Sequence, residues 1–210
     1  MLPKMAVVID YQNVHLTGVE LYLPGRPKEE GLIDPFKFAC QLAKARNKDG
    51  DHEVELARVE VYRGLPLQED DASAYRRNLE QQANWQSGHV GVVSVNLRPL
   101  KYVWEWQHGK KVPIRSTRQE KGVDVLCALA LVRLARSGMY DIVVLASRDT
   151  DLAPALDEAA SLKKAKVEAA KWYDHDEKRT YGNIKTKARI WTTSMSREHF
   201  QHSLDRHDYR

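Results

Sequence analysis

Two short, uninterrupted apolar runs constrain the fold of this chain more than any other feature of its sequence. They are Val7–Ile9 and Ile142–Ala146, and β-branched residues dominate both. An apolar run of this length is typical of a strand buried on both faces, as in a parallel sheet. Because parallel strands are joined by crossover connections, usually helices, the two runs predict an α/β fold.

The remaining sequence alternates between strand and helix patterns, which favours a mostly parallel sheet with helices on both faces. We expect strands at 6–10, 54–62, 90–97, 142–146, 167–172 and, as a short sixth strand, 188–191. We expect helices at 36–46, capped by Asp34 with Pro35 at the first position, and at 70–85, 119–136 and 151–162. Residues 21–33 read as a loop. Residues 1–192 are expected to form one domain and residues 193–210 a polar tail, for which the sequence leaves a partly helical structure open.

Composition narrows the class of protein. A hydrophobic content of 42% and a charged content of 30% are ordinary for a globular domain, and no apolar run is long enough for a transmembrane helix. The start of the chain lacks a signal-peptide pattern, so a cytoplasmic location is the default expectation. Cys40 and Cys127 lie in apolar helical patterns and are expected to pack as small hydrophobic residues.

Acidic residues follow both apolar runs. Asp10 ends the first run, with Asn13 three residues later, and Ser147-Arg148-Asp149-Thr150-Asp151 follows the second. Asp124 lies in the first turn of the long apolar helix. Since ligands bind outside the carboxyl ends of parallel strands, these side chains should face one crevice. Crowded carboxylates need a cation, and oxygen-only ligands favour Mg²⁺ or Mn²⁺ over zinc.

All but one of these residues also have a structural explanation. Asp10 or Asn13 would serve as the cap of a following helix, and the helix dipole favours an acid at Asp124 whatever its function. Asp151 is expected to cap the helix that follows it. We assign no such role to Asp149, which makes it the strongest candidate for a metal ligand.

Taken together, three motifs resemble the NYN family, a branch of the PIN-like nucleases, and in particular its LabA-like members. They are Ile9-Asp10-Tyr11-Gln12-Asn13, Glu120-Lys121-Gly122-Val123-Asp124 and Ser147-Arg148-Asp149-Thr150-Asp151-Leu152-Ala153-Pro154, and the resemblance covers about residues 5 to 172. It implies a three-layer α/β/α sandwich, PIN-like, and RNA cleavage that depends on Mg²⁺ or Mn²⁺. The implied acidic ligands are Asp10, Asp124, Asp149 and Asp151, supported by Asn13 and Ser147.

The chain departs from the family pattern at two positions. Arg148 stands where the family often has a small or polar residue, and it would either bind a substrate phosphate or block the pocket. Leu152 stands where Phe is common, which indicates simple variation in the core.

The function that we expect is therefore that of a metal-dependent endoribonuclease. Asp10, Asp124 and Asp149 would hold one or two cations, Asp151 would act through water, and Lys121 and Arg148 would contact phosphate. The alternative is a non-catalytic RNA-binding or regulatory module with the same fold, and a third class is a small-molecule phosphohydrolase with a closed pocket. RNA is the expected partner, no membrane is expected, and the sequence leaves a homodimer open.

Residues 98–117 fit neither a helix nor a core strand. They hold Tyr102, Trp104 and Trp106 among basic residues and predict a hairpin or long loop that turns at His108-Gly109. One interpretation is aromatic stacking with single-stranded nucleic acid. The other, which we favour from the sequence, is a hairpin whose aromatic face covers the core. Because the expected crevice is acidic, the net charge of +4 would lie around it or on the tail. Charge alone agrees equally well with Lys and Arg residues scattered over a solvated surface.

Overall fold

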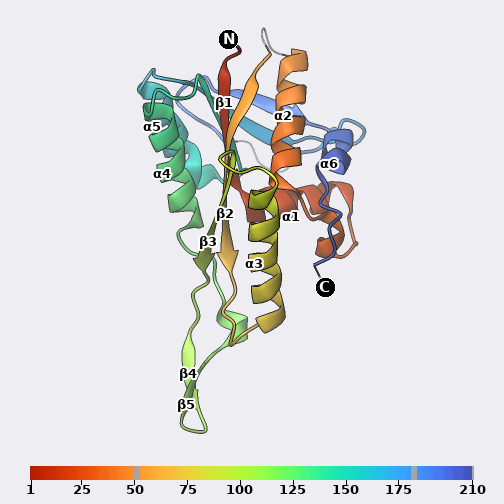
Figure 1. Cartoon of the computed structure of the whole chain (residues 1–210), viewed down its shortest axis with the longest axis vertical. Helices are drawn as coiled ribbons and strands as arrows, with labels where there is room; N and C mark the ends of the chain where they lie inside the picture. Colours follow the sequence, from red (N-terminus) through yellow and green to blue (C-terminus); the bar gives the residue numbers. More distant parts are fainter. Residues whose placement is uncertain (50–52, 181–183, 210) are drawn as a thin grey trace.

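A parallel sheet forms the centre of the protein in the computed structural model, which describes residues 1–49, 53–180 and 184–209 (Figure 1). Within these residues the sheet has six strands in the order β3-β2-β1-β6-β7-β8, and every neighbouring pair is parallel. The strands are β1 (Lys4–Asp10), β2 (Glu55–Leu65), β3 (Val93–Pro99), β6 (Ile142–Ala146), β7 (Lys166–Trp172) and β8 (Trp191–Met195).

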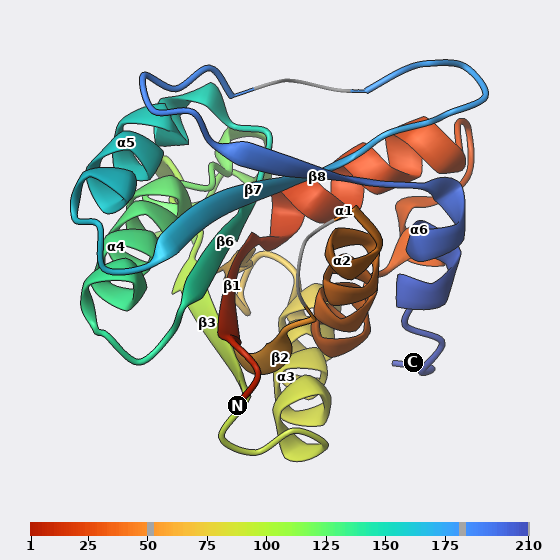
Figure 2. The ribbon, with the colours of Figure 1, turned by 90° about the horizontal axis from the view of Figure 1, so that it is seen from above.

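Helices cover both faces of the sheet (Figure 2). One face carries α1 (Tyr11–Tyr22), α2 (Pro35–Asp49), α3 (Ala72–Ser87) and α6 (Arg197–Ser203). The other carries α4 (Val123–Arg136) and α5 (Ala153–Ser161). Short 3-10 turns lie at η1 (Lys28–Gly31), η2 (Arg115–Thr117) and η3 (Thr150–Leu152). This arrangement confirms the three-layer α/β/α sandwich.

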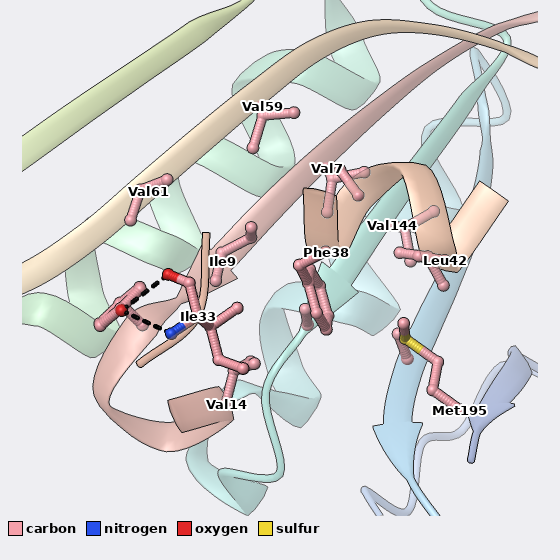
Figure 3. Close-up of a cluster of buried hydrophobic side chains, with 14 of the residues drawn as sticks. Val7, Ile9, Val14, Ile33, Phe38, Leu42, Val59, Val61, Val144 and Met195 are labelled. Carbon is pink, nitrogen blue, oxygen red and sulfur yellow. Dashed lines mark hydrogen bonds between the residues drawn. The ribbon is translucent and has the colours of Figure 1, made fainter. Parts of the chain in front are cut away.

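Strand β1 shows why its sequence is apolar on both sides. Val7 and Ile9 face the core beneath α2, where Phe38 and Leu42 pack against them (Figure 3). Val8 faces the opposite core, beneath α4 and α5. All of these side chains are at most 2% exposed, so β1 is buried on both faces as predicted.

Helix α1 was not among the expected helices, although Asp10 was considered as the cap of a following helix. It follows β1 without a break, and Asp10 caps it by accepting a hydrogen bond from the backbone N–H of Asn13 at 3.3 Å. Tyr11, Val14, Gly18 and Tyr22 are buried at helical spacing. The hydroxyl of Tyr11 fixes the entry to α2 by hydrogen bonding to the backbone of Ile33.

The end of the chain also differs from the expected polar tail. Residues 191–195, rather than 188–191, form the edge strand β8, and α6 follows directly. Phe200 of α6 is buried, and its ring lies 5.1 Å from that of Tyr22 and 5.5 Å from that of Trp172. A large aromatic residue therefore anchors this otherwise polar segment on the α2 face, together with the ion pair of Arg197 with Asp174.

The hairpin predicted after β3 is present, but it does not cover the core. Strands β4 (Trp104–Gln107) and β5 (Lys110–Pro113) pair with each other and project beyond the carboxyl end of the central sheet (Figure 1). His108 and Gly109 turn the chain with positive φ angles of 49° and 77°, as a tight two-residue hairpin requires. All four residues of β4 are exposed, so our preferred interpretation of its aromatic face is wrong.

Two smaller expectations concern cysteines and membranes. Cys127 is buried in α4 and Cys40 is half-buried in α2, and both are free thiols. Every helix within the described ranges is too short or too polar to span a membrane.

Candidate active site

The strand order creates a crevice between β1 and β6. The chain leaves β1 toward β2 on one side of the sheet and returns to β6 on the other, so the direction of winding reverses between these two strands. Such a reversal opens a crevice at the carboxyl ends, where ligands bind in sheets of this kind. Asp10 ends β1 and Ser147 follows β6 directly. The two acidic motifs therefore meet at this point, as the sequence predicts.

A chain of hydrogen bonds joins the motifs. Both carboxylate oxygens of Asp10 are used, because Oδ1 accepts from the backbone N–H of Asn13 and Oδ2 accepts from the Ser147 hydroxyl at 3.0 Å. Ser147 Oγ in turn accepts from the backbone N–H of Asp149 at 3.1 Å. Asn13 Oδ1 accepts from the backbone N–H of Arg148 at 3.0 Å. Asn13 and Ser147 therefore hold the loop after β6 against the end of β1.

An open pocket of about 530 Å³ lies over this network. The carboxylates in its wall come from three separate parts of the chain, and two basic residues stand beside them. These residues are Asp10, Glu120, Asp124 and Asp149, with Lys121 and Arg148.

Glu120 is the site residue that the sequence interpretation did not nominate. Its Oε2 accepts a hydrogen bond from the backbone N–H of Gly64, at the end of β2, at 2.8 Å. A Cβ at residue 64 would collide with this carboxylate, so glycine lets Glu120 approach the backbone here without moving aside. The signal in the sequence was the position of Glu120 in the same motif as Asp124, but the contact with Gly64 spans 56 residues and depends on the fold.

Gly122 determines where α4 begins. The sequence predicted a start near residue 119, but Gly122 has a φ of 78° and precedes the first helical residue, Val123. Arg98 Nε lies close to Gly122 and donates to the backbone carbonyl of Lys121 at 2.7 Å. This turn directs Glu120 and Lys121 to one side of the pocket and places Asp124 in the first turn of the helix, half-buried at the pocket wall.

The acidic surroundings alter the ionisation of the site. Burial raises the pKa of Asp10 to about 6, an effect that Glu120 and Asp149 increase and that the hydrogen bonds from Ser147 and Asn13 partly oppose. Desolvation and the nearby Asp124 raise the pKa of Glu120, although its hydrogen bond with Gly64 and the charge of Arg63 act against this. Burial is the main reason that the charged forms of both carboxylates are disfavoured, and the neighbouring carboxylates add to it.

The structure gives the capping role that we expected of Asp151 to Asp149. Asp149 is the residue that caps η3, because its Oδ1 accepts from the backbone N–H of Asp151 at 2.9 Å. It therefore has a structural role that we did not assign to it. Asp151 is exposed, and it does not line the pocket. Helix α5 starts two residues later, at Ala153, without a side-chain cap.

The donor chemistry of the pocket fits a hard divalent cation, since its potential ligands are all oxygen atoms. Within residues 1–49, 53–180 and 184–209, however, no three His, Cys, Asp or Glu side chains lie close enough together to form a ready metal site. The carboxylates share a pocket without forming a compact cage.

The fold and the pocket define an α/β protein with an acidic crevice at the reversal point of a parallel sheet. The family model for the NYN domain matches residues 4–172, so the chain belongs to the NYN domain family, within the PIN-like nuclease superfamily. Its assignment to the LabA-like branch stays a prediction. No curated protein matches the sequence. A solved structure of a protein of unknown function from Vibrio parahaemolyticus is 19% identical, with a TM-score of 0.45, over 80% of this chain and 81% of that one.

Proposed function

We propose that this protein is an endoribonuclease that depends on Mg²⁺ or Mn²⁺. The observation that carries the proposal is the pocket at the reversal point, whose wall contains Asp10, Asp124 and Asp149, in a chain of the NYN family. The pocket is open to solvent, which suits a polymer that enters and leaves from the side. A small-molecule phosphohydrolase would instead enclose its substrate.

Asp10, Asp124 and Asp149 would hold the cation, with Glu120 as a further carboxylate in the same wall. A divalent cation supplies a water of lowered pKa and offsets negative charge on the phosphate. Ser147 and Asn13 keep Asp10 turned toward the pocket through their hydrogen bonds. The exposed residues Lys121 and Arg148 would hold the phosphate backbone at the rim.

Asp151 has a smaller, indirect role in this proposal. It lies on the turn that Asp149 caps, outside the pocket wall, so it would act on the attacking water or on the cation through water molecules.

The direct test is cleavage of a labelled single-stranded RNA by the purified protein in Mn²⁺ or Mg²⁺, with EDTA as the negative control. Asp149→Asn should lower kcat/KM by at least about a hundredfold, a loss that would exceed 2.7 kcal/mol in transition-state stabilisation. The fold should survive, because Asn also caps well. Asp151→Asn should lose less activity, and Glu158→Gln on the exposed face of α5 should lose none. Full activity in Asp149→Asn would refute the assignment.

One observation favours the alternative, a non-catalytic RNA-binding module. The described carboxylates do not form a ready metal site. Thermal unfolding separates the two functions, because a cation that binds only the folded state raises the Tm by mass action. If the protein is a nuclease, millimolar Mn²⁺ should raise the Tm of the wild type and much less that of Asp124→Asn. RNA binding without a Tm shift or cleavage would establish the alternative.

A further inference from the structure

The hairpin beyond the sheet presents two different faces. We call residues 101–119 the arm, since a bridge between Lys101 and Gln119 closes its base. Residues directly opposite in an antiparallel pair share a face, and β4 pairs Trp104 with Pro113 and Trp106 with Lys111. One face therefore carries both tryptophans and Lys111, whose Nζ lies 5.9 Å from the Trp104 ring centroid. The other face carries Glu105 and Gln107, which hydrogen bond to each other.

The tryptophans on this face are exposed, Trp104 to 41% and Trp106 to 75%. Large aromatic side chains are usually buried, and they form surfaces of this kind where a partner covers them. Neither ring contributes to the two hydrophobic cores of the protein. Their exposure on a projecting hairpin needs an explanation other than folding.

The charge of the arm identifies the partner. Residues 101–119 contain five Lys and Arg residues and one Glu, and the rest of the chain contains 28 basic and 28 acidic residues. The arm therefore carries the entire positive excess of the chain, which we had expected around the crevice or on the tail. Exposed aromatic rings within a field of positive charge are how proteins hold single-stranded nucleic acid.

The arm is fixed at its base and leads into the pocket. Tyr102 donates a hydrogen bond to Asp70 Oδ2 at 2.8 Å, and Arg115 Nε donates to Oδ1 of the same residue at 2.7 Å. The returning strand β5 continues through η2 to Glu120 and Lys121, which form part of the pocket wall. A chain bound along the arm would thus reach the carboxylates.

We propose that the arm binds the single-stranded part of an RNA substrate, with bases stacked on Trp104 and Trp106 and phosphates held by its Lys side chains and Arg118, which are all exposed. The proposal rests on the proposed function, because it identifies the substrate of the same pocket as single-stranded RNA that extends past the cleavage site. A duplex keeps its bases stacked on one another and cannot use these rings.

Binding measured in EDTA tests the arm separately from cleavage. The probes are a labelled 20-nucleotide single-stranded RNA and a 20-base-pair RNA duplex, followed by fluorescence anisotropy. The Trp104→Ala/Trp106→Ala variant should bind the single strand at least about tenfold more weakly and the duplex nearly as well as the wild type does. The Phe pair at the same positions should restore most of the binding. Gln107→Ala, on the opposite face, should bind as the wild type does.

The outcomes distinguish failure of the arm from failure of the nuclease. Arm-dependent binding without any cleavage would refute the nuclease and support the arm. Cleavage and single-strand binding that are unchanged in the Ala variant would refute the arm alone. An equal loss of binding to the single strand and to the duplex would refute stacking.

Sedimentation tests whether the arm is instead a self-association surface. A wild-type dimer that becomes a monomer in the Ala variant, with RNA binding unchanged, would show this. Lys111→Ala tests the phosphate contacts of the arm. It should reduce the salt dependence of single-stranded RNA binding by about one phosphate contact, and an unchanged salt dependence would refute this contact.

Discussion

At the scale of single residues, Asp10 combines a structural and a chemical role. Its pKa is raised from 3.8 to about 6, so between these pH values the folded protein binds protons more strongly than the unfolded chain. The free energy of unfolding therefore falls as the pH rises through this window. Above the window the loss is complete and amounts to at most about 3 kcal/mol. In EDTA, Asp10→Asn should be more stable than the wild type at pH 7.5, with the difference vanishing toward pH 4.

Urea unfolding at several pH values measures this difference. The exposed Asp151→Asn is the control, and its free energy of unfolding should follow the wild-type curve. A gap between Asp10→Asn and the wild type that does not change with pH would show that burial does not raise the pKa of Asp10.

Arg148 is the residue whose role decides how substrate is held. It is exposed at the pocket wall, and a guanidinium can grip a phosphate with two hydrogen bonds. Arg148→Ala should weaken RNA binding, flatten its salt dependence by about one phosphate contact and lower cleavage. Arg136 lies at the last residue of α4, whose first turn lines the pocket. Arg136→Ala is therefore the matched control, and it should change neither RNA binding, nor its salt dependence, nor cleavage. Stronger Mn²⁺ binding and faster cleavage in Arg148→Ala would instead mean that Arg148 blocks the pocket.

At the scale of elements, the start of α4 depends on one glycine. Gly122 has a φ of 78° and Arg98 packs against it, whereas Gly138, just after the same helix, has a φ of 70° and open space around it. Gly138→Ala should lower the free energy of unfolding by about 1–2 kcal/mol, because alanine is strained in the left-handed conformation. Gly122→Ala should cost more, because Arg98 must also move, and it should lower cleavage by displacing Glu120 and Asp124. Equal losses of stability in chemical denaturation would show that the Arg98 contact is unimportant.

At the scale of the whole molecule, a buried ion pair ties a helix to the sheet. Arg46 of α2 donates to Glu168 of β7 from Nε at 2.8 Å and from Nη2 at 3.0 Å, and the side chains are 7% and 0% exposed. Arg46→Met should lower the free energy of unfolding by about 3 kcal/mol, because it leaves the buried charge of Glu168 without this partner. This is the lower end of the usual range, since Lys166 still contacts Glu168 at 3.0 Å.

The control for this prediction is the exposed pair of Arg26 and Glu30, with side chains 64% and 44% exposed. Arg26→Met should cost less than about 1 kcal/mol. Denaturant unfolding of both variants provides the comparison, and equal losses would contradict the assigned importance of burial.

Much of the fold could be predicted because its signals are local. The apolar runs at 7–9 and 142–146 identify strands that are buried on both faces, and Asp34 with Pro35 marks the start of α2, where the backbone N–H of Lys37 donates to Asp34 at 2.9 Å. Helix α1 was missed although its burial spacing is visible in the sequence. The sixth strand was expected at 188–191, three residues before β8 begins. The packing of α6 on the core was not predicted, because Phe200 anchors this polar segment through contacts made only in the folded protein.

The sequence by itself determined a parallel α/β fold with acids at the strand ends, because hydrophobic periodicity and turn chemistry act within a few residues. Only the tertiary structure decided that β1 lies beside β6, which brings Ser147 to Asp10 across 137 residues. It also placed Glu120 against Gly64 and turned the aromatic face of β4 toward solvent instead of the core. These outcomes depend on which distant segments pack together, and a pattern of neighbouring residues carries no information about that choice.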